Sequence, residues 1–173
     1  RALGHPLLSD EARVSNDGRP KGGVMGAMVT DGLQLYLAEG SSSGRAIAAI
    51  PGGGGESAFL STSFGLAEVQ AISPRRSEVL ITDFSHGLGW PLWILPLPAG
   101  KPYRAGEVMA TAAAFSPDGQ EIAFIRDREL YRANANGTNP RRITALPNTA
   151  FWLRWSPDGI RLRFTVGDVV SKN

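Results

Sequence analysis

The residue pattern with the most direct chemical meaning is Gly40-Ser41-Ser42-Ser43-Gly44, which matches the Gly-x-Ser-x-Gly motif of serine hydrolases. In those enzymes the central serine sits on a strand-to-helix turn, where a histidine and a carboxylate activate its hydroxyl. Here the motif joins two segments that both read as strands, and only His5 and His86 could act as the base. We therefore interpret it as a hairpin loop and expect that this chain is not an enzyme and has no catalytic residue.

Two further patterns could bind a phosphate or a metal ion, but turns explain both. Gly52 to Gly55 is glycine-rich, yet neither Gly-Lys-Ser nor a predicted helix follows it, as a phosphate-binding loop requires. Asp118 and Asp158 supply one carboxylate per turn, which is too few ligands for calcium or magnesium, so we interpret them as turn caps. The chain has no cysteine. We predict no metal site and no cofactor.

The composition favours an all-β domain and gives no support to several partner classes. Short strands joined by tight turns account for 21 glycines and 12 prolines spread along 173 residues. A net charge of +2 without a basic tract gives no support to direct nucleic acid contact. No stretch approaches 18 consecutive apolar residues, so we expect no membrane span in this segment.

A repeat of about 40–43 residues decides the fold. Phe115-Ser-Pro-Asp-Gly119 and Trp155-Ser-Pro-Asp-Gly159 share one form, and Ile72-Ser-Pro-Arg-Arg76 and Val29-Thr-Asp-Gly32 fall at matching places. The four anchors are spaced 43, 43 and 40 residues apart. Repeats of this length are typical of propellers and solenoids.

Each repeat is predicted to be a four-stranded antiparallel meander. In the best-preserved copy the strands are predicted at 111–115, 121–126, 129–134 and 141–146, and Asn136-Gly137 is a hairpin signal, although with Thr138 it is also a formal glycosylation sequon. Ala112 to Ala114 supply small side chains where strands would crowd near an axis. We therefore predict β-propeller blades: three full blades and a partial fourth.

The residues from Ala114 to Phe124, then Glu129-Leu-Tyr131 and Asn136 to Thr144, resemble the TolB-type, WD-repeat-like propeller repeat. More narrowly, Leu33 to Leu37, Pro91 to Pro96 and Phe151 to Trp155 are similar to the propeller portion of acidobacterial winged-helix transcriptional regulators. That resemblance implies a sensor or interaction module on the far side of a membrane from the DNA-binding domain, hence in the periplasm. The alternative is a structural propeller segment of a prolyl-oligopeptidase-like hydrolase or of a TolB-like transport-associated protein.

The repeat also predicts blade limits. We expect one propeller segment over 1–173, with blades at about 25–60, 69–105, 111–146 and 151–173. Residues 11–15 read as the outer strand of a preceding or closing blade. Three modes of completion remain open: excision from a larger ring, closure by that strand, or a homo-oligomer formed through open blade edges.

Topology selects the candidate binding residues. In a four-stranded blade, the loop between the second and third strands lies at the same end as the connectors between blades, opposite the Ser-Pro-Asp-Gly turns. Aromatic and charged residues on such loops are candidate contacts for a protein, peptide or small ligand. They are His86, Trp90, Arg126, Arg128, Glu68, Phe151 and Trp152. For Trp90 and Trp152, packing between blades is an equally good interpretation, and Trp93 and Trp155 are assigned to the core.

Overall fold

The computed structural model describes residues 29–30, 32, 34–41, 44–56, 58–60, 63–85 and 90–167. Within these ranges the chain forms strands and turns and no helix, as the sequence predicts. Among the same residues, no helix is long and apolar enough to cross a membrane. The predicted strand at 11–15 lies outside the described residues.

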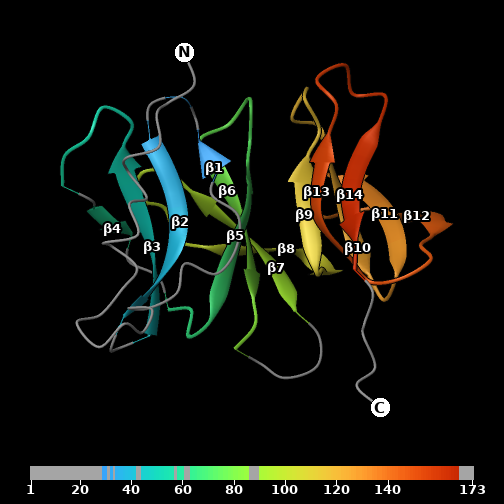
Figure 1. Cartoon of the computed structure of the whole chain (residues 1–173), viewed down its shortest axis with the longest axis horizontal. Helices are drawn as coiled ribbons and strands as arrows, with labels where there is room; N and C mark the ends of the chain where they lie inside the picture. Colours follow the sequence, from blue (N-terminus) through green and yellow to red (C-terminus); the bar gives the residue numbers. More distant parts are fainter. Residues whose placement is uncertain are drawn as a thin grey trace.

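The strands form four antiparallel sheets, each in the order of the sequence (Figure 1). The first sheet contains β1 (Val29–Thr30), β2 (Gln34–Ser41), β3 (Gly44–Pro51) and β4 (Ala58–Leu60). The second contains β5 (Ala67–Ile72), β6 (Glu78–Asp83), β7 (Pro91–Pro96) and β8 (Tyr103–Met109). The third contains β9 (Ala112–Phe115), β10 (Glu121–Arg126), β11 (Glu129–Asn134) and β12 (Arg141–Ala145). The fourth contains β13 (Ala150–Trp155) and β14 (Leu162–Val166). Three four-stranded meanders and a partial fourth confirm the predicted fold class.

The glycine-rich patterns are turns. Ser41 pairs with Gly44 at the end of the β2–β3 hairpin, so the Gly-x-Ser-x-Gly sequence spans a strand-to-strand connection and lacks the helix of a nucleophile elbow. Gly54 donates its N–H to Pro51 O at 3.0 Å in the β3–β4 turn. Gly137, at φ +84°, donates to Asn134 O at 2.8 Å in the β11–β12 turn.

The first strands of successive sheets lie next to one another at the centre of the molecule. β9 contacts both β5 and β13, and β5 contacts β1. Figure 1 shows the β1–β4 sheet at one side, the β9–β14 strands at the other, and the β5–β8 sheet between them. Ala112, Ala113 and Ala114 are buried at this convergence, where larger side chains would separate the blades.

Two apolar clusters hold neighbouring sheets together. One joins the second, third and fourth sheets and includes Leu80, Phe124 and Leu153, none of which is measurably exposed. The other joins the first and second sheets through Tyr36, Ile47 and Val79. Trp93 and Trp155 are partly buried and pack against the edges of these clusters. Both faces of the central strands are therefore covered, as stacked blades require.

The sheets have two ends, which we name by their loops. The connector end carries the links between sheets and the β6–β7 and β10–β11 loops, at 63–66, 84–85, 90, 110–111, 127–128 and 146–149. The turn end carries the β5–β6, β9–β10 and β13–β14 turns, at 73–77, 116–120 and 156–161.

Candidate functional site

The residues selected from the sequence, apart from His86, lie at or near the connector end of three successive sheets. Backbone hydrogen bonds tie its loops together: Ala110 N–H donates to Trp90 O at 2.8 Å, and Leu146 N–H donates to Arg128 O at 2.7 Å. His86 lies outside the described residues. A rigid end of this kind presents side chains in fixed positions.

Two of these residues are held by neighbours on their own sheets. Trp90 packs edge-on against Phe84, with ring centroids 5.0 Å apart. The Arg126 guanidinium lies 4.6 Å from the ring centroid of Tyr131. The Tyr131 hydroxyl donates to Glu129, and with the Arg142 guanidinium it lowers the pKa of that carboxyl below its ordinary value. Arg126 therefore belongs to a cation–aromatic–carboxylate cluster on the third sheet.

The fourth sheet supplies the most exposed aromatic residues. Phe151 and Trp152 are 41% and 59% exposed on β13. Trp152 has φ +54° and lies at an irregularity in the pairing with β14, which turns the strand locally. Glu68, on β5, attracts the Arg154 guanidinium of β13 electrostatically. Glu68 of the second sheet therefore interacts electrostatically with the fourth sheet. Arg128 is exposed in the β10–β11 turn.

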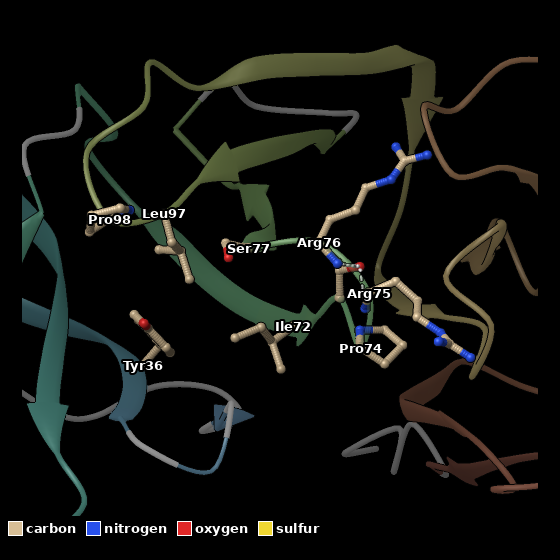
Figure 2. Close-up of a pocket in the computed structure, with 9 residues that line it drawn as sticks. Tyr36, Ile72, Pro74, Arg75, Arg76, Ser77, Leu97 and Pro98 are labelled. Carbon is tan, nitrogen blue, oxygen red and sulfur yellow. Dashed lines mark hydrogen bonds between the residues drawn. The ribbon is translucent and has the colours of Figure 1, made fainter.

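The turn end contains a cavity of about 570 Å³ between the first and second sheets (Figure 2). Tyr36 faces it from β2, while Ile72 and Leu97 face it from the second sheet. The remaining lining residues belong to the β5–β6 and β7–β8 turns of the second sheet: Ser73, Pro74, Arg75, Arg76, Ser77 and Pro98. Figure 2 shows the Arg75 and Arg76 side chains directed away from Tyr36, and the lining of the cavity combines polar and apolar residues.

The turn of the second sheet differs chemically from the other two. In the β9–β10 turn, Asp118 accepts hydrogen bonds from the Ser116 hydroxyl at 2.6 Å and from Gln120 N–H at 3.0 Å. These donors lower the pKa of Asp118. In the β5–β6 turn the corresponding position is Arg75, and the Ser73 hydroxyl instead accepts from Arg76 N–H at 3.1 Å. The second turn therefore replaces a capped carboxylate with two cations.

A second cavity of about 380 Å³ lies at the turn end where the second, third and fourth sheets converge. It includes the half-buried Arg154 and the apolar side chains of Ile72, Phe115 and Trp155. Sequence reasoning placed binding residues only at the connector end and missed both cavities. The available signal was the alignment of the repeats, which shows arginine at a position where two other blades have alanine.

The described residues contain no group of three or more histidine, aspartate or glutamate side chains that could hold a metal ion. The charged groups near the turn end are mostly arginines, and the carboxylates there accept hydrogen bonds from their own turns.

Comparison with known proteins places this architecture among propellers. No family model matches the chain. Among solved structures, a TolB homologue from Agrobacterium tumefaciens has a TM-score of 0.69 at 21% identity, covering 81% of this chain and 53% of that one. TolB from Acinetobacter baumannii has a TM-score of 0.65 at 16% identity, covering 84% of this chain and 38% of that one. The fold is a TolB-like β-propeller.

Other similar proteins share this propeller architecture or part of its sequence. A chain of the nidogen/laminin complex has a TM-score of 0.65 at 14% identity, covering 86% of this chain and 59% of that one. Among curated proteins, the uncharacterized peptidase YuxL of Bacillus subtilis is 37% identical over 82 residues, which is 43% of this chain and 12% of YuxL. The chain therefore spans about half or less of the TolB propellers that it matches and a small part of YuxL.

Proposed function

We propose that this chain is a non-catalytic β-propeller segment that binds a protein, a peptide or a small ligand at one end of its blades. The observation that carries the proposal is the presence of exposed aromatic and cationic side chains at the connector end, such as Trp152 on β13 and Arg128 in the β10–β11 turn. Large aromatic residues and arginine dominate the energetics of protein interfaces. The similarity to a chain of the nidogen/laminin complex supports a protein partner.

We assign the module to the sensing or interaction part of a larger bacterial transcriptional regulator, located in the periplasm. This assignment is supported by the sequence resemblance of Leu33 to Leu37, Pro91 to Pro96 and Phe151 to Trp155 to such regulators. Pairing between open blade edges to form a homo-oligomer stays a prediction of the same proposal. Direct contact with nucleic acid is assigned to a separate domain.

A second function is favoured by one specific observation. The 37% identity to the peptidase YuxL over 82 residues supports a role as a propeller segment of a prolyl-oligopeptidase-like hydrolase. In that case the segment would still bind a protein, a peptide or a small ligand. It would contribute no catalytic group, because the nucleophile would belong to another domain of the protein.

Labelling of the full-length protein with a fluorophosphonate probe separates the two roles. Such probes modify an activated catalytic serine, so the regulator predicts no labelling, together with a winged-helix sequence upstream in the gene. Labelling that is lost on mutation of a serine outside this chain would overturn the regulator and establish the hydrolase. Labelling lost on Ser42→Ala would overturn the non-catalytic assignment itself.

A further inference from the structure

The cavity at the convergence of three sheets is formed by equivalent residues of the three blades. Ala71, Ala114 and Arg154 each lie two residues before a turn serine, and their partners across the strand pair are Leu80, Ala123 and Arg163. The register at this position is therefore the same in all three blades. All three residues line the cavity of about 380 Å³.

The difference between the blades creates room for a ligand next to a positive charge. Ala71 and Ala114 are buried and have no side chain beyond Cβ, so two of the three equivalent positions leave space open. The third position carries an arginine, which is half-buried. Among the described residues that line this cavity, Arg154 is therefore the one with a charged side chain.

Within the part of the chain that the structure describes, the Arg154 guanidinium donates one hydrogen bond. Its Nη1 donates to Leu153 O at 2.8 Å, which accounts for one of the five N–H groups of a guanidinium. Glu68 of β5 attracts the guanidinium electrostatically, and Arg163 of β14 repels it. Burial lowers the pKa of Arg154, and the charge is nevertheless retained at neutral pH. A partly desolvated cation of this kind is stabilised by an anion that reaches it.

Apart from Ser156, the rest of the lining consists of apolar residues, and its aromatic side chains are held in place. Phe115 is buried, and Trp155 is fixed because its indole N–H donates to Ala114 O at 3.3 Å while Arg132 lies 4.8 Å from its ring centroid. Ile72 and three turn prolines, Pro74, Pro117 and Pro157, complete the apolar part. The volume falls within the range typical of pockets for small molecules.

We propose that this cavity binds a small organic carboxylate with an apolar body, in which Arg154 binds the carboxylate and Phe115 and Trp155 contact the apolar part. The inference rests on the proposed function as a binding module and names its ligand class. It also places the ligand at the turn end, opposite the loops selected from the sequence. Arginine suits this role because its planar N–H fork matches a carboxylate in a bidentate geometry.

The test is a titration of the 173-residue chain with phenylacetate and with phenylacetamide, followed by the indole N–H resonance of Trp155. The two probes have nearly the same shape and differ in charge. We expect saturable binding of phenylacetate that is about tenfold or more tighter than that of phenylacetamide, because a charged hydrogen-bonded pair contributes at least that factor. Equal affinity for the two probes, or no saturable shift with phenylacetate, would overturn the proposal.

Variants assign the binding to one residue. Arg154→Gln should weaken phenylacetate binding about tenfold or more, and Arg154→Lys, which retains the charge and loses the fork, should give an intermediate loss. The matched control is Arg163→Gln on β14, which removes the cation paired opposite Arg154 and should change the affinity by no more than about twofold. Thermal melts show whether each variant folds. If Arg154→Gln does not fold, the affinity of Arg154→Lys for phenylacetate tests the assignment. Unchanged binding in the Arg154→Lys and Arg154→Gln variants would overturn the assignment.

The source of the carboxylate is resolved by the dipeptide Gly-Phe and its amide. Tighter binding of Gly-Phe than of phenylacetate, lost on amidation, identifies a peptide C-terminus, whereas weaker binding identifies a free small acid. Failure of all four probes would remove this inference and leave the proposed function standing, because that function is tested by labelling of the full-length protein.

Discussion

Single residues in the turns show which local features can be read from the sequence. Asp118 and Asp158 were interpreted as turn caps, and each accepts hydrogen bonds from a serine hydroxyl and from the backbone N–H two residues later. This could be predicted because the turn is a local structure whose residues specify it. The contact that Arg75 makes could not be predicted from its turn. Its side chain packs beside Gly119 of the next blade, and that neighbour is 44 positions away in the sequence.

The Ser116–Asp118 pair predicts a pH-dependent stability. Because the pKa of Asp118 is lowered in the folded chain from an ordinary value of 3.8, the carboxylate stabilises the fold above that pH. The contribution is lost as the pH falls through the lowered folded pKa. Asp118→Asn should therefore lower the melting temperature at about pH 7, and this difference should shrink as the pH falls below the ordinary value of 3.8. A difference between wild type and variant that stays constant or grows in acid would contradict this explanation.

At the scale of strands, the limits predicted for the third blade agree closely with the structure. Its four strands were expected at 111–115, 121–126, 129–134 and 141–146, and they occupy 112–115, 121–126, 129–134 and 141–145. Strong turn signals on each side fix these limits. The sequence does not predict the irregular pairing of β5 at Gln70. At this position Gln70 accepts a hydrogen bond from Ala113 N–H of the neighbouring blade, at 3.3 Å, and that partner is distant in the sequence. Contacts between blades leave no local signal.

The β11–β12 turn makes a contact between blades that can be tested by adding one methyl group. A Cβ on Gly137 would lie 2.2 Å from Ala105 O of the second blade, so Gly137→Ala must displace backbone. We expect a loss of about 1–3 kcal/mol from overpacking, in addition to about 1 kcal/mol for an alanine at positive φ. Chemical denaturation measures the loss.

Gly54→Ala is the matched control for that experiment. Gly54 also has a positive φ, of +88°, but a Cβ there would meet nothing within 4 Å. The control therefore reports the conformational cost alone. Equal losses in the two variants would show that the turn of the third blade does not press on β8.

At the scale of the whole molecule, the repeat predicts the architecture but not how it is used. The period of about 40–43 residues implies radial blades because each meander must cover its neighbour, and the structure confirms this for the three full blades and the partial fourth. The proposed ligand site could not be predicted in the same way. Trp152 and Arg128 follow from the predicted blade topology together with residue type, whereas the cavity at Arg154 exists only because three distant strands converge.

The central claim is that the sheets are consecutive blades packed around a common axis, and contacts between β5, β9 and β13 test it most directly. Nuclear Overhauser spectroscopy should connect the Trp155 indole N–H with Ala114, and the Gln70 side-chain amide with Ala113 N–H, since both pairs are hydrogen-bonded between blades. Trp155→Phe removes the first signal and assigns it. Cross-peaks within each sheet but none between these strands would contradict the account, because the chain would then consist of separate sheets and not of a propeller.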